Sequence, residues 1–116
     1  MSAATYNILA EQGATFTRSM LYTDIAGAPI DLTGYTATMQ VRLKASSPTV
    51  IIELSTTNSK LTLGGTAGTI VQSIDAATMI TLAAGKYVYD LELYNGAITT
   101  RLIQGSFTIS AEVTRI

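Results

Sequence analysis

The clearest pattern in the chain is a strict alternation of apolar and polar residues between residues 35 and 44. The apolar positions are Tyr35, Ala37, Met39, Val41 and Leu43, and the polar positions are Thr36, Thr38, Gln40, Arg42 and Lys44. A period of two places these sets on opposite faces of an extended strand, so the segment predicts a strand buried on one side. The pattern returns twice, with expected inward faces Tyr87, Tyr89, Leu91 and Leu93, and then Phe107, Ile109, Ala111 and Val113.

Short segments of this type follow one another along the chain, separated by turn residues such as Gly13, Gly34 and Gly85. We expect strands at Thr5–Leu9, Thr15–Thr23, Tyr35–Lys44, Val50–Ser55, Lys60–Leu63, Thr69–Ile74, Lys86–Tyr94, Ile98–Ile103 and Ser106–Arg115. Many short strands at this spacing are typical of an antiparallel β-sandwich. The sequence therefore predicts an all-β protein with one sandwich domain over residues 13–116, preceded by an N-terminal arm or edge strand over residues 1–12. Greek-key and jelly-roll connectivity both fit this pattern.

One segment, residues 75–82, breaks the strand pattern and is typical of a short helical turn with Asp75 as its N-cap. This segment leads through Gly85 to Tyr87. In an immunoglobulin-like sandwich, the corner between the two sheets likewise has a tyrosine near the start of the next strand. Tyr89 then takes the position of the antibody cysteine. The chain has no Cys and no Trp, so we expect an immunoglobulin-like sandwich without the antibody disulfide and tryptophan.

The pair Asn95-Gly96 predicts a two-residue hairpin turn between the last long strands. Such a turn fixes the strand register: Tyr94 would lie opposite Ala97, Leu93 opposite Ile98, Glu92 opposite Thr99, Asp90 opposite Arg101, and Val88 opposite Ile103. Val88 and Ile103 would then form an outward apolar pair on a polar face. We expect a subunit interface there, with Val88, Ile103, Tyr94, Tyr6 and Ile8 as its candidate residues.

The amino-acid composition excludes several classes of reactive site and partner. The chain has 116 residues, 47% of them hydrophobic and only 13% charged, which leaves little charge to keep copies apart. It has no His and no Cys, so Ser-His and Cys-His nucleophiles and thiolate metal sites are excluded. The net charge is −1 with scattered basic residues, which argues against nucleic-acid binding. The first residues do not resemble a signal peptide and no apolar run is long enough to cross a bilayer, so we expect synthesis in the cytoplasm and no membrane partner.

The acidic residues offer few candidate sites. Asp90 and Glu92 share a strand face at a spacing that inverting glycosidases use, but a solvated ladder with Arg101 explains them better. Asp24 and Asp31 offer oxygen atoms of the kind that Ca²⁺ takes, yet their spacing matches no EF-hand, and capping of their own turns is the favoured interpretation. The loop at residues 64–68 lacks the Lys and the helix of a phosphate loop and is typical of a hairpin tip. We therefore expect no catalytic residue, no metal ligand and no cofactor.

Several runs of the sequence resemble small immunoglobulin-like structural proteins of tailed bacteriophages, which occur as modules at the beginning of baseplate and tail-fibre proteins and as free-standing virion proteins. The runs are residues 27–35 (GAPIDLTGY), 39–42 (MQVR), 85–93 (GKYVYDLEL), 101–105 (RLIQG) and 112–115 (EVTR). The resemblance extends from about Gly13 to Arg115 and carries no catalytic residues.

The resemblance implies a non-enzymatic virion protein that assembles in multiple copies at the tail or baseplate, with other virion proteins as partners. Edge strands, an apolar face and the arm Ser2–Glu11 would supply the contacts. A decoration protein on the capsid is an alternative within the same class. A carbohydrate-binding module is an alternative of another class, which would use exposed Tyr6, Tyr22 and Tyr94; a glycosidase using Asp90 and Glu92 is the enzymatic alternative.

Overall fold

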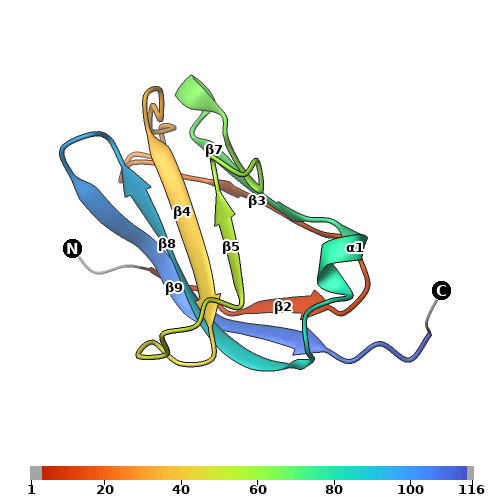
Figure 1. The fold of residues 1–116 in the computed structure, drawn as a ribbon. Helices are drawn as coiled ribbons and strands as arrows, with labels where there is room; N and C mark the ends of the chain where they lie inside the picture. The colour runs from red at the N-terminus through yellow and green to blue at the C-terminus, as the bar shows by residue number, and fades with distance from the viewer. Residues whose placement is uncertain (1–3, 115–116) are drawn as a thin grey trace.

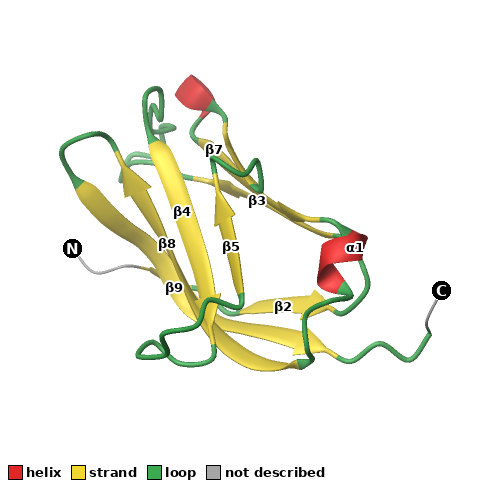
Figure 2. Ribbon diagram, viewed as in Figure 1, coloured by secondary structure: helices red, strands yellow, loops and turns green. Residues whose placement is uncertain are grey.

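The computed structural model describes residues 4–114, which form two sheets packed face to face (Figure 1). The larger sheet contains β1 (Ala4–Thr5), β2 (Ile8–Glu11), β4 (Thr36–Arg42), β5 (Ile52–Ser55), β8 (Gly85–Tyr94) and β9 (Thr99–Ser110). The smaller sheet contains β3 (Phe16–Leu21), β6 (Leu61–Leu63) and β7 (Thr69–Ile74). A 3₁₀ turn at Gly65–Ala67 and the helix α1 (Ala76–Met79) are the helical pieces of this part of the chain, as Figure 2 shows. The predicted all-β sandwich is confirmed.

The order of the strands is that of an immunoglobulin-like Greek key. The larger sheet runs β1-β9-β8-β4-β5, with β2 also on β9, and the smaller sheet runs β3-β7-β6. The chain passes from the smaller to the larger sheet twice, between β3 and β4 and between β7 and β8 (Figure 1). The N-terminal strands β1 and β2 pair with β9 in parallel, whereas the other strand pairs are antiparallel. Of the two connectivities that the sequence allows, the structure therefore has the Greek key and not the jelly roll.

The core lies between the sheets and is built from the faces that the alternation predicts. Tyr87, Tyr89, Leu91 and Leu93 of β8 are buried, as are Ala37, Met39 and Val41 of β4. Phe107 is fully buried and meets Phe16 and Tyr89 edge to face, with ring centroids 5.7 Å and 6.4 Å apart respectively. These aromatic contacts join β3 to β8 and β9 and so hold the two sheets together.

The corner between the sheets forms as the sequence predicts. The Asp75 carboxylate accepts a hydrogen bond from the Thr78 N–H at 3.0 Å and caps α1. The Tyr87 hydroxyl donates to the Ala83 carbonyl at 2.7 Å, which is the tyrosine-corner arrangement of immunoglobulin-like sandwiches. The corner therefore sets where β8 begins and which of its residues face the core.

The predicted register of the β8–β9 hairpin is wrong. Tyr94 lies opposite Thr99 rather than Ala97, because the connection spans residues 95–98 and the Asn95 side chain accepts from the N–H groups of Ala97 and Ile98. The register shifts again between Leu91, opposite Ile103, and Glu92, opposite Arg101. Leu102 is thus the extra residue of a β-bulge.

The predicted outward orientation of Ile103 is wrong for a related reason. β9 runs without a break through Gly105, where the sequence predicts a gap between two strands, so Ile103 shares the inner face with Phe107 and is only 5% exposed. Gly105 has another role, because a Cβ atom there would collide with the Tyr6 carbonyl. The absence of a side chain lets the N-terminal segment lie close against β9.

The inward faces of two strands end earlier than predicted. β9 stops at Ser110, opposite the last residue of β2 and just past Ile109, which lies opposite the first residue of β8. Ala111 and Val113 therefore have no neighbouring strand and are exposed rather than buried. Leu43 lies beyond the end of β4 and is exposed as well. Arg115, the expected end of the last strand, lies outside the described residues.

Candidate functional site

The five predicted interface residues do not form one patch. Ile103 and Ile8 are buried in the core, whereas Val88, Tyr94 and Tyr6 are exposed. Val88 lies opposite Ser106 instead of Ile103, and Tyr94 lies at the far end of the same strand. The predicted Val88–Ile103 pair therefore does not exist, because the longer hairpin connection and the bulge change the register.

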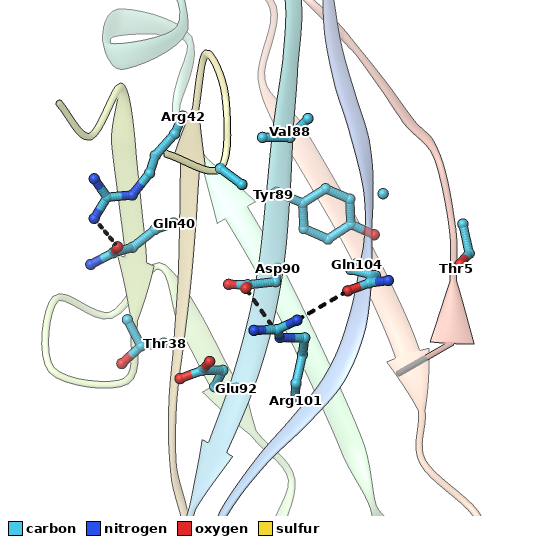
Figure 3. Close-up of a pocket in the computed structure, with 12 residues that line it drawn as sticks. Thr5, Thr38, Gln40, Arg42, Val88, Tyr89, Asp90, Glu92, Arg101 and Gln104 are labelled. Carbon is cyan, nitrogen blue, oxygen red and sulfur yellow. Dashed lines mark hydrogen bonds and ion pairs between the residues drawn. The ribbon is translucent and has the colours of Figure 1, made fainter. Parts of the chain in front are cut away.

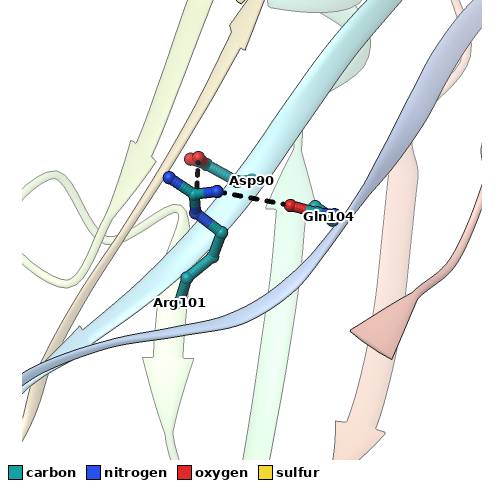
Figure 4. Close-up of polar contacts among 3 residues, drawn as sticks. All are labelled: Asp90, Arg101 and Gln104. Atoms are coloured by element: carbon teal, nitrogen blue, oxygen red, sulfur yellow. Dashed lines mark hydrogen bonds and ion pairs between the residues drawn. The ribbon is translucent and has the colours of Figure 1, made fainter. Parts of the chain in front are cut away.

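The outer face of the larger sheet carries a shallow polar cavity of about 610 Å³, which Figure 3 shows. Its lining side chains come from β1, β4, β8 and β9 and include Asp90, Glu92, Arg101 and Gln104. The Nε atom of Arg101 lies 3.4 Å from Oδ2 of Asp90, and its Nη1 atom lies 3.5 Å from Oε1 of Gln104 (Figure 4). The predicted ion pair between Asp90 and Arg101 is confirmed, although it is diagonal, because the longer hairpin connection places Arg101 opposite Glu92.

A second set of polar contacts lies toward β5. Nε2 of Gln40 donates to the Glu53 carboxylate at 2.7 Å, and Nη2 of Arg42 donates to Oε1 of Gln40 at 2.8 Å. Nη1 of Arg42 also donates to the Ser47 carbonyl at 2.7 Å. These side chains are bonded to one another across neighbouring strands. The network fits the predicted solvated ladder, which aligns strands and contributes about 0.2–1 kcal/mol per exposed pair.

The other acidic candidates cap their own turns. Asp24 accepts hydrogen bonds from the N–H groups of Ala26 and Ala28, at 2.9 Å and 3.0 Å. Asp31 accepts from the Thr33 N–H at 2.9 Å, and the hydrogen bonds to Thr33 lower the pKa of its carboxyl. Within residues 4–114 there is no group of three or more His, Cys, Asp or Glu side chains placed to hold a metal ion.

The loop at residues 64–68 closes the β6–β7 hairpin with a 3₁₀ turn. It begins no α-helix whose N-terminus could hold a phosphate. Among the described helices, none is long and apolar enough to cross a membrane.

The N-terminal strands are held against β9 by side chains from the core. The Tyr89 hydroxyl donates to the Tyr6 carbonyl at 2.7 Å, and burial raises the pKa of Tyr89 to about 12. The Asn7 side chain accepts from the Ser106 N–H at 3.1 Å. Residues 4–11 therefore lie along one edge of the larger sheet in this chain, while Ser2 and Ala3 of the expected arm lie outside the described residues.

A second feature, the open side of the sandwich along β3, has no counterpart among the predicted sites. A cavity of about 980 Å³ lies beside residues 20–23 and 99–104, and one of about 290 Å³ lies beside residues 14–18 and β2. Two buried polar atoms have no hydrogen-bond partner among the described residues, Nη1 of Arg18 and Oε1 of Gln72, and both residues lie on this smaller sheet. Alternation identifies a strand but not whether it lies at a sheet edge, so no sequence signal located this side.

No known protein-family model matches the chain, and no curated protein matches it.

Proposed function

We propose that the protein is a non-enzymatic structural protein of a tailed-bacteriophage virion, which assembles in multiple copies at the tail or baseplate. The observation that carries this proposal is the open side of the sandwich along β3, where an unpaired strand edge lies between two cavities. An unpaired edge offers backbone N–H and C=O groups to another chain and is a common means of assembly.

Exposed apolar side chains at the ends of two strands and in the connections that follow them support an assembly role. Leu21 and Tyr94 end β3 and β8, and Ile25 and Ile98 lie in the connections that follow these strands; all four are exposed. Exposed large apolar side chains of this kind mark contact surfaces when they gather near one another. A protein that works through contacts with its neighbours needs such surfaces and needs no reactive group.

The polar face of the larger sheet supports a catalytic function less well than a structural one. Asp90 is already paired with Arg101, and Gln40 is bonded to both Glu53 and Arg42. The chain contains no His and no Cys to act as a general base or nucleophile. These features favour a role in which the face aligns strands.

The assignment to a virion rests on the sequence runs that resemble phage structural modules, together with the immunoglobulin-like order of the strands. Two of these runs have structural roles: residues 85–93 form most of β8, and residues 101–105 contain the bulge and Gly105. Residues 4–11 would contribute to the assembly surface from their position on β9. Other tail or baseplate proteins would be the partners.

Immunogold electron microscopy tests the proposal. Antibodies against the purified protein would be applied to intact particles of the phage that encodes the chain, with particles from a deletion strain as the control. We expect label at the tail or baseplate that disappears with the deletion and returns with the wild-type gene. Label on the head would support the capsid-decoration alternative instead, and label on no part of the particle would contradict a virion role.

A further inference from the structure

β3 has one edge that no described residue pairs with. The Tyr22 N–H donates to the Gly68 carbonyl at 2.9 Å and extends the β3–β7 ladder by one pair. Because bonded pairs alternate along an antiparallel ladder, Arg18 and Met20 also face β7. The N–H and C=O groups of Thr17, Ser19 and Leu21 then point away from β7. Within residues 4–114 no hydrogen bond reaches these groups.

The other sheet edges are short or covered, as natural proteins arrange them. At β5, the Asn58 side chain accepts from the Ser55 N–H and donates to the Glu53 carbonyl, both at 2.9 Å. β6 has three residues, and the N-terminal edge consists of β1 with two residues and β2 with four. β3 has six residues, and it contains no Pro, no Lys and no bulge. It is the longest edge among the described strands that no neighbouring segment covers.

The side chains of β3 leave this edge accessible. Thr17, Ser19 and Leu21 are uncharged and exposed. The one charged residue of the strand, Arg18, is turned toward the N-terminal segment, where its Cζ atom lies 3.8 Å from the centroid of the Tyr6 ring. Its charge is therefore held away from the edge. The two cavities on either half of β3 leave space for the side chains of an added strand.

We propose that β3 of one copy pairs antiparallel with β3 of a second copy about a two-fold axis at Ser19, joining the two smaller sheets into one. The strand is complementary to itself in this register. The small Ser19 lies at the axis in a hydrogen-bonded pair with the partner's Ser19, and Thr17 lies opposite the partner's Leu21. Arg18 lies opposite the partner's Met20, so the two guanidinium groups do not face each other, and the net charge of −1 adds little repulsion. This inference deepens the proposed function and rests on it, because it states how two copies meet.

Single-cysteine variants test this register, since the chain contains no Cys of its own. Directly opposite residues in a bonded antiparallel pair have Cα atoms about 5.5 Å apart, which a disulfide can span. We expect oxidised S19C to run on a non-reducing gel as a covalent dimer of twice 12.2 kDa. T17C and L21C should each fail to cross-link alone, because the same residue in the two copies is then separated by roughly 14 Å along the strands. A mixture of T17C and L21C should cross-link.

The exposed loop variant S46C measures cross-linking by random collision. S19C dimer no more abundant than S46C dimer would overturn the β3 pairing. If light scattering then still showed an oligomer, copies would meet elsewhere and the proposed multi-copy function would stand. A monomer at every concentration with no S19C cross-link would count against both.

A proline variant supplies a second, independent readout. The Ser19 N–H makes no bond within the described chain, so S19P keeps the β3–β7 ladder but blocks an added strand. We expect S19P to keep the far-UV circular dichroism of the wild type while its mass by light scattering falls to that of a monomer. A folded S19P that dimerises as the wild type does would overturn the pairing.

Discussion

Tyr89 connects the core to the N-terminal strands, so its substitution tests the packing of the sandwich most directly. The ring is buried against Phe107, with centroids 6.4 Å apart, and the hydroxyl donates to the Tyr6 carbonyl at 2.7 Å. Replacing a buried aromatic ring by Ala typically costs about 3–5 kcal/mol, so Tyr89→Ala should lower the free energy of unfolding by that amount. Tyr89→Phe keeps the ring and loses one hydrogen bond, which should cost about 0.5–1.5 kcal/mol.

Urea unfolding followed by circular dichroism measures both variants. A domain of this size is stable by roughly 5–15 kcal/mol, so Tyr89→Ala should shift the midpoint strongly and Tyr89→Phe only slightly. A loss below about 1 kcal/mol for Tyr89→Ala would refute the inward orientation of this residue. Equal losses for both variants would mean that the hydroxyl, and not the ring, supplies the stability.

The contribution of the Tyr89 hydroxyl to stability should depend on pH, which a comparison of the wild type with Tyr89→Phe can measure. The pKa of Tyr89 is raised from 10.0 to about 12 in the folded chain, because burial disfavours the phenolate. The folded state thus holds this proton more tightly, so its contribution is complete below pH 10 and is lost as the pH rises from 10 to 12. Two pKa units correspond to at most about 2.7 kcal/mol, which partial access of water reduces to about 1–2 kcal/mol. The wild type should therefore lose more stability than Tyr89→Phe across this range, and parallel curves would contradict the assignment.

Three further predictions concern the surface and the corner. A double-mutant cycle of Asp90→Ala and Arg101→Ala, measured by urea unfolding, should give a coupling energy of about 0.2–1 kcal/mol; a coupling above about 2 kcal/mol would mean that the pair is not a solvated ladder. Gly105→Ala should release the N-terminal strands, seen as faster hydrogen exchange at residues 4–11, because its Cβ meets the Tyr6 carbonyl; unchanged exchange would contradict that contact. Asp75→Ala should lower Tm above pH 4 and should lose less stability on acidification than the wild type. Hydrogen bonds to Thr78 lower the pKa of Asp75 in the folded chain, so its stabilising contribution disappears as the pH falls through that pKa. Identical stability curves for the two proteins at acid pH would refute the cap.

The parts of the fold that could be predicted are those set by local chemistry. The inward faces of β4 and β8 follow from side-chain alternation, and the corner follows from the positions of Asp75 and Tyr87. A period of two and a capping side chain act over a few residues, so their signals are present in the sequence itself.

The parts that could not be predicted depend on contacts between distant segments. Asn95-Gly96 favours a two-residue turn, but Asn95 instead caps a longer connection, and the bulge at Leu102 changes the register again. The open edge of β3 exists because β1 and β2 pair with β9 rather than with β3. No local pattern records which sheet an N-terminal strand joins, so the sequence predicts contacts through edge strands without identifying β3 as the exposed edge.

Association of this sandwich with copies of itself can be seen directly in its solution mass. Multi-angle light scattering of the wild-type protein across a concentration series would give the mass of the species present. We expect a mass that rises with concentration from 12.2 kDa to at least twice that value. A mass of 12.2 kDa at every concentration would contradict self-association through β3.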